Sequence, residues 1–341
     1  MLTPSRPFAA LGPIATHVPS HVVTDEDLVE HFPGPSVPKL AAKTGIHRRH
    51  VVTDGETASD LAVAAAERLF TEHAVDRSSV DQVLLVTQSP DFAMPTTSCL
   101  VQDRLGLPTS VGAVDIGMGC SGWVYGLGLA TALVESGQAE NVLLLTADTL
   151  SRYINRDDRQ LRVLFGDAAA ATLVRSGADR PRIRGLARGT DGSGARHLIV
   201  PGGGLADAAG LAPAASAQAR GLTSNGRDMH MDGAEVFSFS LRVVPQVVEE
   251  SLRRAGTTLD EVDLVVLHQA NAFMLETLRL KLGVLADKFV VAMAETGNTT
   301  SSSIPFALEA ARADGRAAPG SRVLVVGFGV GLSWAAAVVD L

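Results

Sequence analysis

The sequence is poor in cysteine, carries no excess of basic residues and has no long apolar run. Only two of its 341 residues are cysteine, which argues against a disulfide framework and for a reducing compartment. No uninterrupted apolar run reaches the roughly 18 residues that a membrane span needs, and the N-terminal residues lack the apolar core of a signal peptide. We therefore expect a cytoplasmic protein that does not cross a membrane.

The excess of acidic residues argues against a nucleic-acid-binding protein, and two missing motifs argue against a metal enzyme. The formal net charge of −8 argues against general nucleic-acid binding, which normally requires a basic excess. Neither a Cys-x-x-Cys pair nor a His-Glu-x-x-His segment occurs, so we expect no metal site and no cofactor. An acidic partner would need a local basic patch.

Length and patterning predict an α/β fold. A chain of 341 residues, of which 46% are hydrophobic, is long enough for two domains or two fused halves. Strand-like apolar runs alternate with helix-like segments, which predicts an α/β fold with a largely parallel sheet. The expected strands include 83–87, 111–116 and 141–147, and the expected helices include 57–74, 96–105 and 121–136.

The second half of the chain repeats the first. Residues 80–86 resemble residues 262–268 at an offset of 182, and the strands that begin at Val142 and Val323 match at an offset of 181. A shared offset is harder to obtain by chance than two similar strands, so we infer an internal duplication. The two similar halves would pack about a pseudo-twofold axis. The expected halves are 1–178 and 179–341.

Cys120 stands where a strand-like run meets a helix that is apolar on nearly every face. Gly117 and Gly119 make the turn before it permissive. At a helix N-terminus the unpaired N–H groups and the positive end of the dipole favour the thiolate, the nucleophilic form of cysteine. We interpret Cys99, in a helix-like segment without glycines, as a buried small apolar residue. Cys120 is therefore the candidate nucleophile.

Two polar residues are expected near Cys120. His268 follows the apolar run 264–267, at the strand end where α/β proteins usually place their sites. Asn298 lies in a turn of small residues before a helix. The offset between the halves maps Cys120 to position 302, beside Asn298. The duplication would therefore bring a Cys/His/Asn set to one central site.

At these residues the chain resembles the β-ketoacyl-acyl-carrier-protein synthase III family, condensing enzymes of the thiolase fold. The resemblance covers nearly the whole chain, and its motifs are highly specific as an ordered set. They are Thr44-Gly45-Ile46, the turn at Cys120, Phe165-Gly166-Asp167, Met231-Asp232-Gly233, His268-Gln269-Ala270-Asn271, Gly297-Asn298-Thr299 and the segment from Gly327 to Trp334. The resemblance implies duplicated halves that form a layered α/β/α/β/α core.

The resemblance also implies a decarboxylative Claisen condensation. Cys120 would accept the acyl primer, while His268 and Asn298 would bind the malonyl thioester and stabilise its enolate as neutral donors. The backbone N–H groups of Cys120 and Val330 would form the oxyanion hole. The family usually has glycine at the position of Val330, but valine retains the N–H group.

Phe165 and Met94 belong, by the same resemblance, to the acyl pocket. In the family the residue before the Pro95 position crosses the dimer interface and closes the pocket of the second subunit, so we expect a homodimer. Because Met94 is flexible, we expect a pocket deeper or more adaptable than one made for acetyl. The loop 201–225, rich in Gly and Ala, is expected to cover the entrance.

Two departures from the family bear on the carrier of the primer. Relatives that take coenzyme A primers hold the adenine between a tryptophan and an arginine, whereas Lys39 and Phe273 stand at those positions. Phe273 could still stack on a base, but acyl-carrier protein is an alternative donor. Carrier proteins are acidic and would be complementary to basic residues. The candidate contacts to carrier protein or coenzyme A are Lys39, Lys43, Arg48, Arg49, Asn271, Phe273, Arg279 and Lys281.

Two other functions stay open. An acyltransferase of the same fold would load Cys120 and pass the acyl group to a hydroxyl or amine, but such relatives tend to have an acid at the position of Asn298, because they need a base. A non-catalytic partner subunit of another synthase typically lacks the nucleophile. We therefore predict condensation of an acyl primer with a malonyl thioester, in a specialised fatty-acid or polyketide-type pathway.

Overall fold

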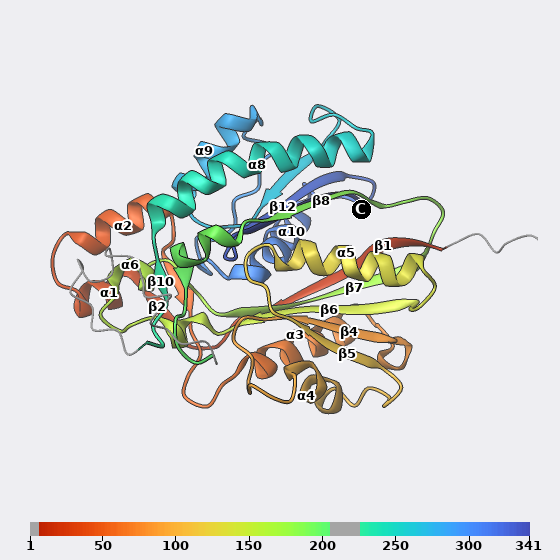
Figure 1. The fold of residues 1–341 in the computed structure, drawn as a ribbon, viewed down its shortest axis with the longest axis horizontal. Helices are drawn as coiled ribbons and strands as arrows, with labels where there is room; N and C mark the ends of the chain where they lie inside the picture. Colours follow the sequence, from red (N-terminus) through yellow and green to blue (C-terminus); the bar gives the residue numbers. More distant parts are fainter. Residues whose placement is uncertain (1–6, 205–225) are drawn as a thin grey trace, which may run out of the picture.

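The computed structural model describes residues 7–204 and 226–341 (Figure 1). Two β-sheets lie one above the other, one with the order β1-β7-β6-β4-β5 and one with the order β11-β12-β13-β8. Their strands are β1 (Phe8–His17), β4 (Gln82–Val86), β5 (Gly112–Ile116), β6 (Asn141–Asp148), β7 (Ala168–Ala178), β8 (Ile183–Thr190), β11 (Leu264–Leu267), β12 (Arg322–Gly329) and β13 (Ser333–Asp340). Small sheets pair β2 (Val22–Thr24) with β3 (Arg48–His50), and β9 (Leu198–Ile199) with β10 (His230–Met231).

Helices cover the outer faces of both sheets and fill the space between them. The first sheet is covered by α3 and α4, α5 and α10 lie between the sheets, and α8 covers the second sheet (Figure 1). None of the described helices is both long and apolar enough to cross a membrane. The helices are α1 (Asp25–His31), α2 (Ser36–Thr44), α3 (Ala58–Glu72), α4 (Thr97–Arg104), α5 (Gly122–Glu135), α6 (Arg159–Arg162), α8 (Gly233–Ala255), α9 (Ala272–Leu282) and α10 (Ser303–Ala313).

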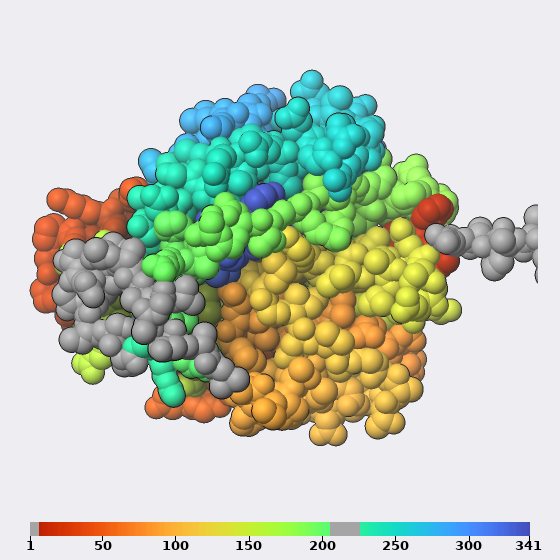
Figure 2. All heavy atoms as spheres, viewed as in Figure 1, coloured from red at the N-terminus to blue at the C-terminus, as the bar shows by residue number. Residues whose placement is uncertain are grey.

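Alternation along the strands produces this layering. In β4, Leu84 and Val86 pack with α5 between the sheets, whereas Val83 and Leu85 pack with α3 on the outer face. Because successive side chains of a strand point to opposite faces, each strand supplies two layers of the core. The helix α5 is apolar on nearly every face because it packs against both sheets. On the surface, β8 (green) separates α8 (cyan) from α5 (yellow) (Figure 2).

The topology confirms the predicted duplication. The order β1-β7-β6-β4 in the first sheet matches β8-β13-β12-β11 in the second, and the matching neighbours pair in the same directions. The counterpart of β5 is reduced to a single bridge between Val265 and Phe289. We propose that the boundary between the halves lies after Ala178, where β7 ends.

The expectation of a largely parallel sheet is wrong, because both main sheets are mixed. Parallel pairing joins β4 to β5, β4 to β6, and β11 to β12, whereas β7 and β13 run antiparallel to both of their neighbours. The connection between β12 and β13 explains one such pair, since β12 ends at Gly329 and β13 begins at Ser333. So short a connection makes a hairpin and leaves no room for a helical crossover.

Candidate active site

Cys120 lies in the turn between β5 and α5, just before the helix begins at Gly122. It is buried and lies against the end of β12. A Cβ atom on Gly327 would lie 2.7 Å from Ser121 Cα, and one on Gly329 would lie 2.8 Å from the Cys120 sulfur. Side chains do not fit at such distances, so glycine at the end of β12 makes room for Cys120 and Ser121.

His268 and Asn298 reach the same place as Cys120. The three residues line one cavity of about 70 Å³. His268 follows β11, and its backbone N–H donates to the Val326 carbonyl (2.8 Å). Asn298 precedes α10, and its backbone N–H donates to the Leu164 carbonyl (2.9 Å). The fold therefore brings together the three side chains that the sequence singled out.

Thr300 links His268 and Asn298. Its φ of 48° lies in the left-handed region, which is uncommon for a residue other than glycine. The Thr300 N–H donates to Asn298 Oδ1 (3.0 Å), and the Asn298 NH₂ group, which makes no hydrogen bond to any described residue, can donate to a ligand. Ser303 Oγ lies 2.8 Å from His268 Nδ1 and 2.8 Å from the Thr300 carbonyl oxygen. One turn thus orients both side chains.

Burial controls the charge of both reactive side chains. It lowers the pKa of His268 to about 3, so the imidazole is neutral near pH 7. Burial, together with the Asp148 carboxylate, raises the pKa of Cys120 to about 12. The expectation that the helix terminus favours the thiolate is therefore wrong for the free protein, because loss of hydration disfavours the charged sulfur more than nearby N–H groups favour it.

The backbone N–H groups of Val330 and Cys120 hydrogen-bond the Cys120 sulfur and act to lower its pKa. These are the groups that the resemblance assigns to the oxyanion hole. The Val330 side chain lies beside Gly119, where a Cβ atom would come within 2.7 Å of Val330 Cγ1. Valine at this position therefore keeps the N–H beside the sulfur and adds an apolar wall.

Sequence reasoning missed Asp148, a buried carboxyl at the end of β6. It accepts hydrogen bonds from the Gln88 N–H (2.8 Å), Thr300 Oγ1 (2.6 Å) and Ser301 Oγ (2.6 Å). These donors come from both halves, so the carboxyl ties the halves together beside Cys120. Burial raises the pKa of Asp148 to about 6, which leaves it mostly ionised at pH 7. In the sequence, Asp148 is marked only as a single acidic residue at the end of an apolar run.

Replacing Asp148 with asparagine is expected to lower the pKa of Cys120. The Asp148 carboxylate disfavours the nearby thiolate, and asparagine removes that charge, so thiolate would form at a lower pH than in the wild type. The pH midpoint of Cys120 alkylation by iodoacetamide, followed by peptide mass spectrometry, should shift downward. Asp167→Asn is the matched control, because Asp167 is also a buried carboxyl but does not perturb Cys120. Equal shifts in both variants would contradict the assignment.

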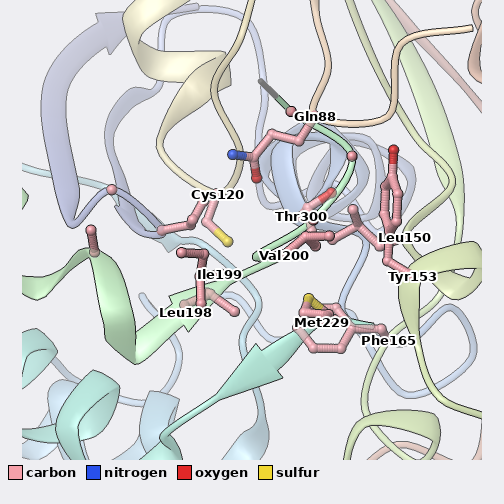
Figure 3. A pocket seen from close by; sticks show the side chains of 16 residues that line it. Gln88, Cys120, Leu150, Tyr153, Phe165, Leu198, Ile199, Val200, Met229 and Thr300 are labelled. Atoms are coloured by element: carbon pink, nitrogen blue, oxygen red, sulfur yellow. The ribbon is translucent and has the colours of Figure 1, made fainter. Parts of the chain in front are cut away.

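A larger cavity of about 460 Å³ opens from Cys120 (Figure 3). Its volume is within the range of small-molecule pockets. A pocket of this size has room for an acyl group longer than acetyl, which is the kind of pocket that the sequence predicts. Phe165 lines it and lies with Met229 away from the Cys120 sulfur (Figure 3). Met94 does not line the cavity of its own chain and is 85% exposed. The apolar lining residues are Leu150, Phe165, Leu198, Ile199, Val200 and Met229.

The predicted entrance loop 201–225 falls mostly outside the described residues. Gly202, Gly203 and Gly204 line the larger cavity, and residues 205–225 are not described. The covering role of this loop stays a prediction.

Arg49 is not a docking charge, although it is one of the candidate contacts to a carrier. Its side chain is fully buried and pairs with Asp25 at 2.9 Å. The guanidinium also donates to the carbonyls of Val23 (3.3 Å) and Val163 (3.1 Å). A side chain withdrawn from solvent cannot meet a partner protein. Arg49 instead ties β3 to β2 and to the segment before β7.

Arg49→Ala is expected to lower the free energy of unfolding by about 3 kcal/mol, because it leaves buried carbonyls and Asp25 without their partner. The neighbouring Arg48 is the matched control, since its side chain is 60% exposed. Arg48→Ala should change stability by no more than about 0.5 kcal/mol. Urea unfolding followed by circular dichroism measures both variants, and comparable small effects would rule out the structural role of Arg49.

The other candidate contacts differ in exposure. Lys39, Arg48 and Lys281 are exposed. Arg279 is mostly covered and forms an ion pair within α9 at 2.7 Å. Asn271 caps the start of α9 with its side chain and lines the 70 Å³ cavity.

The Phe273 ring is already engaged. Phe237 stacks on it with ring centroids 5.5 Å apart, and the Lys43 ammonium lies 4.7 Å from its centroid. Phe273 is nevertheless 47% exposed, so stacking of a nucleotide base on this ring stays a prediction.

Cys99 is exposed on α4, so the expectation that it is buried is wrong. The buried residues of α4 are Thr97, Ser98 and Val101. A short helical segment without glycines predicts a helix but leaves open which face meets the core.

The polar groups around Cys120 are mainly neutral donors. They include the Val330 N–H, the His268 imidazole and the Asn298 amide, and such donors suit a developing oxyanion. Within the described residues, no group of three or more His, Cys, Asp or Glu side chains is placed to hold a metal ion.

Comparison with known proteins identifies the family. Residues 114–192 match the sequence profile of 3-oxoacyl-[acyl-carrier-protein] synthase III, and residues 252–341 match the profile of its C-terminal part. A crystal structure of a 3-oxoacyl-(acyl-carrier-protein) synthase III is 46% identical, with a TM-score of 0.93 over 98% of this chain and 100% of that chain.

Two further structures are similar over nearly their whole length. A 3-oxoacyl-(acyl-carrier-protein) synthase from Burkholderia xenovorans LB400 is 35% identical, with a TM-score of 0.91 over 98% of this chain and 94% of that chain. The priming β-ketosynthase of the R1128 polyketide pathway is 29% identical, with a TM-score of 0.88 over 100% of this chain and 98% of that chain. The chain belongs to the 3-oxoacyl-[acyl-carrier-protein] synthase III family, whose members are acyl-transferring condensing enzymes of the thiolase fold.

Proposed function

We propose that Cys120 accepts an acyl primer from a thioester and that a malonyl thioester then condenses with it. The observation that carries the proposal is the shared cavity of Cys120, His268 and Asn298, from which the larger apolar cavity extends at Cys120. The small cavity would hold the malonyl thioester, and the larger one the primer.

Acyl transfer begins with attack of the Cys120 sulfur on the thioester carbonyl. The N–H groups of Cys120 and Val330 stabilise the tetrahedral oxyanion. The carrier thiolate leaves and takes up the proton lost by the Cys120 thiol, so the step is neutral overall. Because the pKa of the free Cys120 thiol is about 12, little thiolate is present before the reaction. The sulfur therefore loses its proton as it attacks the thioester carbonyl.

Condensation follows in the small cavity. Loss of carbon dioxide leaves an electron pair on the malonyl thioester, and the resulting enolate oxygen accepts hydrogen bonds from His268 and the Asn298 amide. Ser303 Oγ, 2.8 Å from His268 Nδ1, orients the ring, and the neutral imidazole serves as a donor in the tautomer whose proton lies on the nitrogen that faces the enolate. The enolate carbon attacks the Cys120-bound acyl carbonyl, and the Cys120 thiolate leaves as the β-ketoacyl product forms. The thiolate then takes up a proton from water and returns to the thiol.

Intact-mass spectrometry tests this proposal. The wild type should gain an acyl mass from a panel of acyl donors and lose it on addition of malonyl-carrier protein, with formation of carbon dioxide and a β-ketoacyl thioester. Discharge only by a hydroxyl or amine would favour the acyltransferase alternative. Failure to gain an acyl mass from any donor would favour the non-catalytic partner subunit.

We further propose that acyl-carrier protein delivers the primer and that the pathway is a specialised fatty-acid or polyketide one. Lys39 and Phe273 stand where coenzyme A-dependent relatives hold the adenine between tryptophan and arginine, and Phe237 already stacks on the Phe273 ring. Similarity to a polyketide priming ketosynthase supports the pathway class. A cytoplasmic location agrees with the two free cysteines.

We also propose a homodimer formed along β5, the edge strand of the first sheet. Val114 on β5 is exposed, and so are Phe92 and Met94 on the nearby loop. That loop leads into α4, where the Thr97 N–H donates to Asp115 of β5 (2.7 Å). An apolar edge strand offers unpaired N–H and C=O groups to a second strand.

Val114→Lys is expected to convert the dimer into a monomer, because it places a charge on the edge that would pair. Light scattering during size exclusion should then report the chain mass of 35.5 kDa, where the wild type reports twice that value. Val291→Lys is the matched control, since Val291 is equally exposed but lies outside β5 and its loop. A monomeric wild type, or dissociation by both variants, would refute this interface.

A further inference from the structure

Gln88 is a polar residue at the Cys120 end of an otherwise mainly apolar cavity. It follows β4, and its backbone N–H is held by the Asp148 carboxylate (2.8 Å). Its side chain lines the 460 Å³ cavity. Figure 3 shows the Gln88 amide near the Cys120 sulfur, with Phe165 and Met229 farther away.

The Gln88 amide lies very close to the nucleophile's turn. A Cβ atom on Gly119 would lie 2.2 Å from Gln88 Oε1. Gly119 directly precedes Cys120, so glycine at this position leaves space for the amide. The first carbons of an acyl group on Cys120 would therefore lie beside Gln88.

The amide also has unused hydrogen-bonding capacity. Within the described residues its oxygen and nitrogen make no hydrogen bond. The Thr300 hydroxyl, which lines the same cavity, is already committed to Asp148 (2.6 Å). A hydrocarbon primer would displace water from Gln88 without replacing its hydrogen bonds, which is unfavourable for a polar group withdrawn from solvent.

We infer that Gln88 selects acyl primers that carry a hydroxyl or oxo group on the second or third carbon, with an apolar remainder toward Phe165 and Met229. An amide both donates and accepts, so it pairs with either substituent. This inference rests on the proposed function, because it assumes that the acyl group is carried by Cys120. It adds the chemical class of the primer.

A matched pair of primers tests this selection. Hexanoyl and 3-hydroxyhexanoyl groups on the same carrier protein differ by one hydroxyl, and intact-mass kinetics give kcat/KM for acylation of Cys120 by each. The wild type should favour the hydroxylated primer by about tenfold, the effect of one hydrogen bond. Gln88→Leu, which is of similar size but apolar, should remove that preference. Met229→Leu, at the far end of the cavity, should retain it.

The ratio of the two kcat/KM values separates selection from a general effect on folding or catalysis, since those effects move both primers together. An unchanged ratio in Gln88→Leu, or a wild type without preference, overturns the inference. If hexanoyl still loads Cys120 and is discharged by malonyl-carrier protein, the proposed function stands although the inference fails. If neither these primers nor the wider panel of donors loads the wild type, both fail.

Discussion

Cys120→Ala is expected to abolish acyl transfer, with a loss of at least about 10⁴-fold in kcat, because no other described side chain in the cavity can replace the nucleophile. Alanine removes the sulfur but keeps the N–H of the oxyanion hole. The variant should therefore still bind thioesters while gaining no covalent acyl mass. Intact-mass spectrometry after incubation with the best donor measures the covalent step directly.

Cys99→Ala is the matched control, because Cys99 is the second cysteine and lies exposed on α4. It should gain the acyl mass at the wild-type rate. An acyl mass on Cys120→Ala that maps to Cys99 would reveal reaction at the wrong sulfur. Turnover by Cys120→Ala without any covalent mass would exclude Cys120 as the acyl carrier.

His268→Ala and Asn298→Ala are each expected to slow condensation by about 10² to 10³-fold, the usual effect of losing one donor to an oxyanion. Both residues line the small cavity with Cys120, and the proposed enolate would accept a hydrogen bond from each. Acylation of Cys120 depends on different N–H groups and should persist. Single-turnover experiments on the preformed acyl-enzyme, with release of carbon dioxide from malonyl-carrier protein as the readout, isolate the second step.

The acylation step in the same variants is the internal control. A loss of acylation as large as the loss of decarboxylation would show that His268 and Asn298 act on acyl transfer itself. Wild-type decarboxylation in either variant would remove that residue from the enolate site. The neutral state of His268, whose pKa burial lowers to about 3, predicts that its donor role does not weaken as the pH rises from 6 to 8.

The two-halved α/β architecture was predictable because its strands and helices recur in the same order along the chain. Strand alternation and the common offset near 182 residues predicted two similar halves, and their strand orders match. Cys120, His268 and Asn298 stand at strand or helix ends, where backbone groups converge. Local sequence therefore marked the residues that line the small cavity.

Other features depend on which surfaces the fold covers. Arg49 was a candidate contact to a carrier, yet it is buried against Asp25, while Cys99, expected to be buried, is exposed. Asp148 and Gln88 are single polar residues at strand ends with no distinctive spacing. Their roles arise only because donors from both halves reach Asp148 and because Gly119 leaves space for the Gln88 amide.

The sequence by itself determined the duplicated α/β plan and the set of Cys120, His268 and Asn298 that lines one cavity, because periodicity, offsets and ordered motifs can be read along the chain. Only the tertiary structure decided the directions of strand pairing, the charge state of Cys120 and the polar end of the larger cavity. Each of these depends on groups far apart in the chain, and the pKa of Cys120 in particular is set by burial and by the Asp148 carboxylate. Electrostatic interactions depend on the distance between groups in space, and desolvation depends on burial. Neither quantity can be read from the order of residues along the chain.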